Sequence, residues 1–170
     1  MKSRLNAFAF SLFAALPMAG TAAIVQNGSF ENPNATWTNT LGNYMGVASG
    51  STAITGWSVV GAQLRGVAWA QNPAETYFAS QGAFFVDLSG FGTEAGPAAT
   101  VQQTLQNLIA GETYAVSIDY WGDRATLSID GSTIGTSAAA SNGWLRLNSS
   151  FVASGSQALL SVGYIGTSGV

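Results

Sequence analysis

The sequence of 170 residues contains no cysteine and no histidine. Without thiols the chain has no disulfide, no cysteine nucleophile and no thiolate-bound metal. Without imidazole groups it has no serine–histidine catalytic pair and no histidine-bound zinc. The protein therefore depends on its core alone for stability, and it lacks most of the familiar catalytic and metal-binding groups.

The first residues have the pattern of a secretory leader. Lys2 and Arg4 precede an apolar, uncharged run over residues 5–18, and small residues follow up to Ala23. This pattern predicts a signal peptide over residues 1–23, cleaved after Ala23, and a secreted or cell-surface protein. A short membrane anchor and a core helix are the alternatives, but a bilayer span needs about 20 apolar residues. We expect no transmembrane segment in the mature chain.

Positive charge is scarce after the leader. Removing residues 1–23 leaves no lysine and only Arg65, Arg124 and Arg146, against eight acidic residues, so the net charge becomes −5. Three scattered arginines do not form a basic groove for phosphates, so we expect no nucleic-acid partner. Attraction to anionic membranes is disfavoured for the same reason. An exported domain of this size without disulfides also favours a bacterial source.

The remaining chain has the composition and periodicity of strands. The full sequence is 47% hydrophobic, and it contains 21 glycines and five tryptophans but only 8% charged residues. We expect short strands at the following places: residues 24–30, 54–60, 62–68, 83–88, 99–105, 113–121, 125–135, 144–152 and 158–165. Residues 38–52 and 71–81 are expected to form surface loops.

Two segments carry the strongest local signals. Residues 113–121 alternate, with Tyr114 and Ile118 on one face and Asp119 on the other, which predicts a half-buried strand. Asp130 and Gly131 separate two strand-like runs, as in a two-residue hairpin. We predict an all-β fold: one antiparallel two-sheet β-sandwich domain over residues 24–170.

Five segments in order resemble a known family: VQNGSFE at 25–31, GSTAITGWSVV at 50–60, FVDLSG at 85–90, VQQTL at 101–105, and the stretch 111–122. They resemble the DUF642-type and choice-of-anchor domains of bacterial exported proteins, many of which end in a PEP-CTERM sorting tail. Related plant proteins belong to the cell wall. The resemblance implies a galactose-binding-like jelly roll, akin to carbohydrate-binding modules.

The sequence departs from this family at its end. Relatives usually close with a strand that contains an Asp-Asn-Val-like stretch, and many then carry the sorting tail. Neither pattern is found before Val170. We expect either a chain that lacks its last strand and sorting tail or a divergent, freely secreted member.

Glu31 is the candidate metal ligand. In similar carbohydrate-binding jelly rolls an early acidic residue helps to hold a structural Ca²⁺, with an Asp on the last strand. Calcium takes six to eight oxygen ligands, and Asn27 and Asn32 lie near Glu31 in the sequence. The alternative is an ordinary loop carboxylate that stabilises a turn.

The candidate ligand-binding residues are aromatic side chains near strand ends and two polar neighbours: Trp69, Tyr77, Trp121, Trp144, Asp123 and Arg124. Sugar rings have apolar faces that stack on aromatic rings, and hydroxyls that bond polar side chains. Core packing is the alternative for each ring, because Trp and Tyr are mostly buried in sandwiches. We expect Trp69 and Trp121 to be exposed and Trp57 to be buried.

These residues favour a non-catalytic module that binds carbohydrate or extracellular polysaccharide. A glycosidase needs two carboxylates about 5–10 Å apart, and nothing in the sequence pairs Asp119 with Asp123 or Glu75 with Glu94. Solvated loop acids explain them better, so we expect no enzyme. The alternative function is a structural or adhesive matrix protein that assembles without a small ligand.

Overall fold

The computed structural model describes residues 25–61, 66–74, 77–89 and 99–165. All regular structure in these residues is β. The strands, in chain order, are β1 (Tyr44–Val47), β2 (Ser58–Val60), β3 (Val67–Gln71), β4 (Phe84–Asp87), β5 (Thr100–Leu105), β6 (Thr113–Gly122), β7 (Arg124–Ile129), β8 (Ser132–Thr136), β9 (Ala140–Val152) and β10 (Ala158–Ile165). The predicted signal peptide lies outside the described residues. No helix in the described part of the chain is long and apolar enough to span a membrane.

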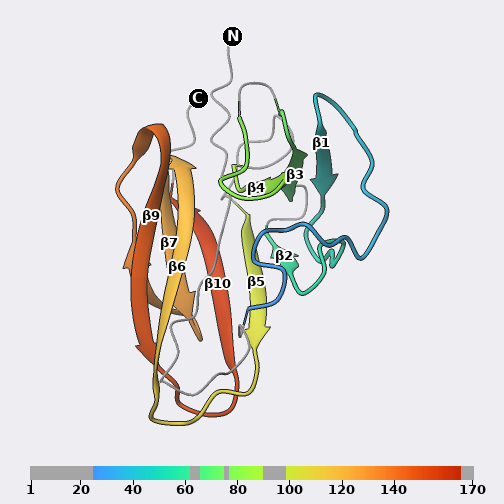
Figure 1. The fold of residues 1–170 in the computed structure, drawn as a ribbon. Helices are drawn as coiled ribbons and strands as arrows, with labels where there is room; N and C mark the ends of the chain where they lie inside the picture. Colours follow the sequence, from blue (N-terminus) through green and yellow to red (C-terminus); the bar gives the residue numbers. More distant parts are fainter. Residues whose placement is uncertain (1–24, 62–65, 75–76, 90–98, 166–170) are drawn as a thin grey trace.

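The strands form an antiparallel sandwich (Figure 1). One layer is a five-stranded sheet in the order β2-β5-β10-β7-β8, and every pairing in it is antiparallel. Opposite it lie a three-stranded sheet, β1-β3-β4, and the pair β6-β9. Buried side chains from all three sheets pack in one hydrophobic core. The predicted all-β sandwich is therefore confirmed.

Strand β6 shows how the sequence pattern builds this core. Tyr114, Val116, Ile118 and Tyr120 are all buried and belong to the main core. Side chains alternate across a strand, so Asp119 and its neighbours two residues away occupy the outer face. The predicted alternation of this segment is confirmed, and it fixes which β6 side chains can meet a ligand.

The hairpin between β7 and β8 is also confirmed. Asp130 and Gly131 have φ angles of 50° and 81°, as a type I′ turn requires. The Oδ1 atom of Asp130 accepts a hydrogen bond of 2.8 Å from the backbone N–H of Leu159. The turn is thereby tied to the start of β10.

Residues 25–30 form turns, so the strand predicted at 24–30 is wrong within the described residues. Asn27 and Phe30 have positive φ angles, which break an extended chain. The buried Gln103 side chain holds this segment instead: its Oε1 accepts from Gln26 N at 2.8 Å, and its Nε2 donates to Gln26 O at 2.9 Å. Nε2 also donates to the carbonyl of Gly56, where an added Cβ would lie 2.9 Å from it.

Strand β1 lies inside the stretch 38–52, which was predicted to be a loop. Its Tyr44 and Val47 are buried, and the strand pairs with β3. The sequence does not predict this strand, because its two buried residues stand among glycine and polar residues. Most of the strand predicted at 62–68 falls outside the described residues, and β3 begins at Val67.

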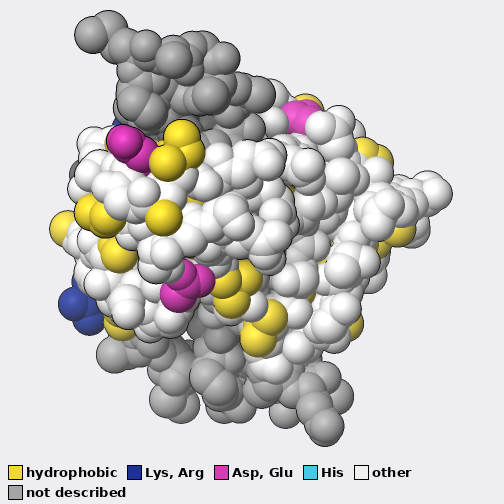
Figure 2. Space-filling view, turned by 90° about the horizontal axis from the view of Figure 1, so that it is seen from below, with side chains coloured by type: hydrophobic (Ala, Val, Ile, Leu, Met, Phe, Trp, Pro, Cys, Tyr) yellow, Lys and Arg dark blue, Asp and Glu magenta, His cyan; other side chains and the backbone are white. Residues whose placement is uncertain are grey.

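The molecular surface reflects the low charge of the sequence. Figure 2 shows the molecule from below: most of the visible surface is uncharged, with scattered hydrophobic side chains and few charged ones. Polar recognition by this protein therefore depends on neutral groups and on a small number of charges at defined positions.

Candidate functional site

A second, smaller apolar cluster lies on the outer face of the three-stranded sheet. Strand alternation directs Trp69 and Val86 into the main core and Ala70 and Phe85 to the opposite face. The buried members of this cluster are Tyr44, Ala68, Ala70, Ala74 and Phe85. Tyr77, Ala79 and Trp144 pack against them and are only partly buried. On this outer face, Phe85 of the sheet contacts Trp144, which lies near the start of β9.

Three of the predicted site residues meet here, and we call Tyr77, Trp121 and Trp144 the aromatic cluster. The ring centroids of Tyr77 and Trp121 lie 5.0 Å apart, and those of Trp121 and Trp144 lie 5.8 Å apart, both edge to face. Trp144 also contacts the buried ring of Phe85 edge to face, at 6.4 Å. Each such pair stabilises the arrangement by about 0.5–1.5 kcal/mol beyond burial. The rings are therefore held in place before any ligand arrives.

The connection between β3 and β4 contacts the aromatic cluster through Tyr77 and Phe78. Trp144 donates its indole N–H to the carbonyl of Phe78 at 2.9 Å, which fixes this connection to β9. The Phe78 ring itself is 56% exposed. An apolar surface is thus presented to solvent beside three partly buried rings.

The indole N–H groups distinguish Trp121 from the other tryptophans. Trp37, Trp57, Trp69 and Trp144 each donate theirs to a backbone carbonyl. Trp121 donates no such bond within the described part of the chain, and its nitrogen is not among the buried polar atoms that lack a partner there. The nitrogen is therefore not completely buried, and no described residue uses its hydrogen.

An ion pair lies on the same outer face. Asp119 on β6 and Arg146 on β9 are directly opposite in register. Arg146 Nε donates to Asp119 Oδ1 at 2.7 Å, and Nη2 donates to Oδ2 at 3.0 Å. The pKa of Arg146 is raised above its ordinary value, first by this hydrogen bond and then by attraction to the carboxylate. The guanidinium is thus always charged at neutral pH.

Asp123 and Arg124 follow Trp121 where β6 passes into β7. Asp123 Oδ2 accepts a hydrogen bond of 2.8 Å from the hydroxyl of Tyr164. Arg124 is exposed and opens β7, opposite Ile165. The structure therefore gives Asp123 a partner on β10.

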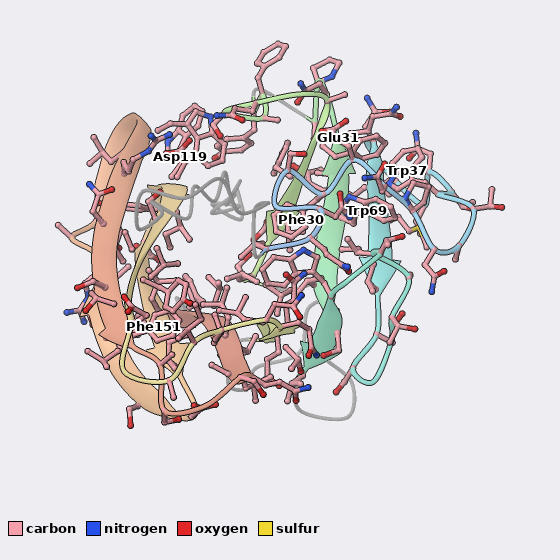
Figure 3. The ribbon with its side chains drawn as sticks, turned by 60° about the horizontal axis from the view of Figure 1, so that its bottom comes forward. Phe30, Glu31, Trp37, Trp69, Asp119 and Phe151 are labelled. Carbon is pink, nitrogen blue, oxygen red and sulfur yellow. The ribbon has the colours of Figure 1, made fainter. Side chains whose placement is uncertain are left out.

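The expectation that Trp69 is exposed is wrong. Trp69 is 0% exposed, and its indole donates to the carbonyl of Phe30 at 3.2 Å. Figure 3 shows Phe30, Trp37 and Trp69 grouped around the β1–β3–β4 half, and Asp119 on the β6–β9 half. Trp69 lies on the core-facing side of β3, whose first four residues are all buried, so it cannot stack on a sugar. Trp57 is buried, as predicted.

Glu31 fastens a loop to β4. Its Oε1 accepts hydrogen bonds from the backbone N–H groups of Ala83 and Phe84, both at 2.9 Å. Within the described ranges no group of three or more acidic, histidine or cysteine residues is placed to hold a metal ion. Calcium at Glu31 stays a prediction, while the loop-fastening alternative has direct geometric support.

Sequence reasoning missed the pairing of Asp119 with Arg146 and the exposed ring of Phe78. A signal for the first existed: Asp119 is two residues from Trp121, and Arg146 is two residues from Trp144. A spacing of two places each pair on one face of a strand. The opposition of the two strands, however, depends on a register that spacing alone does not give.

Comparison with known proteins adds the family. A family model described as "Protein of unknown function (DUF642)" matches residues 23–168. The chain belongs to the DUF642 family. This DUF642 chain is 35% identical over 101 residues to halomucin of Haloquadratum walsbyi, which is 59% of this chain and 1% of halomucin. The galactose-binding-like topology and the link to PEP-CTERM proteins stay predictions.

One solved structure is also similar to this DUF642 chain. It is the C-terminal domain of EclA, described as a sugar-binding protein, with 31% identity and a TM-score of 0.33. The similarity covers 36% of the DUF642 chain and 51% of the solved one. The chain thus matches about half of that domain and a very small part of halomucin.

Proposed function

We propose that this protein is an exported, non-catalytic module that binds carbohydrate through the aromatic cluster. The observation that carries the proposal is the state of Trp121. Its ring is held edge to face by Tyr77 and Trp144, while its indole N–H donates no hydrogen bond to the described residues. A sugar offers an apolar C–H face for such rings and hydroxyl oxygens for such a donor.

The carboxylates support binding rather than catalysis. Asp119 forms a bidentate ion pair, and Asp123 accepts from Tyr164. Glu31 accepts from two backbone amides in the other half of the layer. A glycosidase needs one carboxylic acid and one carboxylate facing each other across the scissile bond. These three groups are instead engaged with separate partners.

Export is supported by the leader pattern over residues 1–23. Extracellular polysaccharides and cell-surface glycans are the partners accessible after export. A shallow, partly wet site of this kind gives modest affinity per site, because ordering and desolvation offset much of the contact energy.

The test is glycan binding by the full chain expressed with its leader, using a glycan array and then calorimetry on the best ligand. Trp121→Phe keeps a ring and removes the N–H, so we expect about fivefold to tenfold weaker binding, the value of one hydrogen bond. Trp121→Ala removes both and abolishes measurable binding. The matched control is Trp37→Phe, because Trp37 is also partly buried and contacts Phe84 edge to face, but is not part of the aromatic cluster.

Unchanged affinity in Trp121→Ala would refute the assignment of the site. Absence of binding to every glycan would refute the function and favour the alternative of a structural or adhesive matrix protein. One observation supports that alternative. Ile109 and Val152 are 60% and 63% exposed, and their segments are joined by the bond from Gly111 N to Ala153 O. Concentration-dependent assembly without glycan, seen by sedimentation, would then be expected.

A further inference from the structure

We infer that the aromatic cluster takes one sugar residue at a time, at the end or at a branch of a glycan, and excludes the flat face of an extended polysaccharide chain. The inference rests on the proposed function and names the ligand class of the same site. It is carried by the angles between the rings, by the polar atoms that the indoles use, and by the place of the cluster in the fold.

Neighbouring rings in the cluster are nearly perpendicular. The planes of Tyr77 and Trp121 meet at 73°, and those of Trp121 and Trp144 meet at 75°. The fold also builds near-parallel rings, since Tyr114 and Phe151 stack at 27°, but both of those are buried. Stacking needs an aromatic face that lies along the face of the sugar, and consecutive sugars of an extended β-linked chain lie along one flat ribbon. Trp121 crosses any plane that Tyr77 and Trp144 could share, so the cluster offers no platform for such a ribbon.

The two indoles of the cluster differ in their polar contacts. Trp144 donates its N–H to the carbonyl of Phe78 at 2.9 Å, and its ring meets the buried ring of Phe85 at 73°. The N–H of Trp121 bonds no described residue. A sugar residue that stacks on Trp121 therefore lies next to rings that stand across its plane, and it finds one indole donor for one of its hydroxyl oxygens. This arrangement suits a single residue better than a row of them.

The cluster also lies at strand ends and not on the face of a sheet. Trp121 is one residue from the end of β6, where the register with β9 shifts, and Tyr77 comes from the β3–β4 connection. On its outer face the five-stranded sheet has a long, regular surface, where one row of side chains crosses all five strands and contains no ring: Ser58, Gln102, Ser161, Ser128 and Thr133. The rings gather instead where irregular pairing gives a small, uneven surface.

The test is a glycan array in which each sugar, among them glucose, galactose, mannose and xylose, occurs both as a terminal residue and inside a linear chain. The full-length protein is applied to this array and to films of cellulose and β-mannan. We expect a terminal residue to bind at least about tenfold more tightly than the same sugar inside a chain, because an internal sugar has neighbours on both sides that meet the perpendicular rings.

Calorimetry then follows the length of the ligand. For the sugar that binds, oligosaccharides of increasing length, from the monosaccharide to the hexasaccharide, are titrated into the same protein. The affinity should rise less than about threefold beyond the disaccharide, because further residues reach no ring of the cluster.

Variants test whether the perpendicular rings are the cause. Tyr77→Ala removes one ring that stands across Trp121, so the preference for terminal over internal residues should fall at least about threefold. Tyr77→Leu keeps an apolar contact with the neighbouring buried cluster and should act in the same direction; it serves if Tyr77→Ala does not fold. Phe78→Ser is the matched control: Phe78 is 56% exposed, but its ring pairs with no ring of the aromatic cluster within the described residues, so both kinds of ligand should weaken alike.

Equal binding of terminal and internal residues, or tighter binding to the cellulose or mannan film, would overturn the inference and leave the proposed function intact. The same follows if the affinity rises about tenfold or more from the disaccharide to the hexasaccharide, or if both Tyr77 variants keep the original preference. If no glycan binds at all, the proposed function fails and the inference fails with it.

Discussion

Two regions of this protein contain the same aromatic residue types, but one region belongs to the core and the other is partly exposed. Around Trp69, the rings of Phe30 and Trp57 lie 5.3 Å apart in the main core, and every indole donates to a backbone carbonyl. In the aromatic cluster the rings are equally close, but they are only partly buried, and the donor of Trp121 bonds no described residue.

The difference lies in what the backbone does around each ring. Trp69 sits in the middle of a strand that is buried on both faces, with Phe30 O directly at its indole. Trp121 sits one residue before the end of β6, where the register with β9 shifts between Tyr120 and Gly122. Irregular pairing at a strand end leaves a side chain partly uncovered, which suits recognition better than stability.

The largest expected effect is a difference in the free energy of unfolding between a variant of the core region and a variant of the aromatic cluster. Trp69→Ala should lower the free energy of unfolding by about 3–5 kcal/mol, because it leaves a large cavity in the core. Trp121→Ala should cost less, about 1–3 kcal/mol, because the substitution removes two edge-to-face contacts of a partly buried ring. Urea denaturation followed by circular dichroism measures both. Equal losses would mean that Trp121 is a core residue and would end the comparison.

A middle effect concerns Glu31, which supports the loop next to Phe30. Glu31→Ala should cost about 2 kcal/mol, since two backbone N–H groups lose a charged acceptor. Glu31→Gln retains an acceptor oxygen and should lose about half as much. If Glu31 only fastens the loop, the melting temperatures in calcium and in EDTA should be the same. A calcium-dependent stabilisation that disappears in both variants would assign the metal ion instead.

The smallest expected effect is that of Phe78→Ser. The Phe78 ring is 56% exposed, and Trp144 bonds only its backbone carbonyl, so stability should change by no more than about 0.5 kcal/mol. Glycan affinity should fall severalfold, because the ring extends the apolar surface of the cluster. Leu41→Ser is the matched control: Leu41 is 74% exposed before β1 and is not part of the aromatic cluster, so its loss should not alter affinity.

The parts that could be read from the sequence are those set by local rules. The alternation of β6 and the turn at Asp130 and Gly131 depend on residues within a few positions of one another. Strand β1 was missed because only Tyr44 and Val47 are buried in it, among glycine and polar residues. The strand forms because it pairs with β3, and no local sequence pattern indicates that pairing.

The candidate site was predictable only in part. Tyr77, Trp121 and Trp144 were identified as aromatic residues near strand ends, but Trp69 satisfied the same criterion and is buried. The difference between these residues depends on tertiary contacts. Trp144 and Trp121 meet because β6 pairs with β9, and Tyr77 contacts Trp121 from the β3–β4 connection. Residue type indicates what a side chain can do, whereas its neighbours decide whether it is accessible.

The Gln103 side chain has a consequence for the order of events during synthesis. Gln26 is held by a residue 77 positions later in the chain, through two bonds that imitate a strand pairing. Translation proceeds from the amino terminus, so Asn27 can already bond to Thr55 and Trp57, while Gln26 lacks its partner until β5 has been made. Contacts between distant residues form late because loop closure must precede them. The contact between Gln26 and Gln103 is therefore expected among the later contacts to form, after those of Asn27 with Thr55 and Trp57.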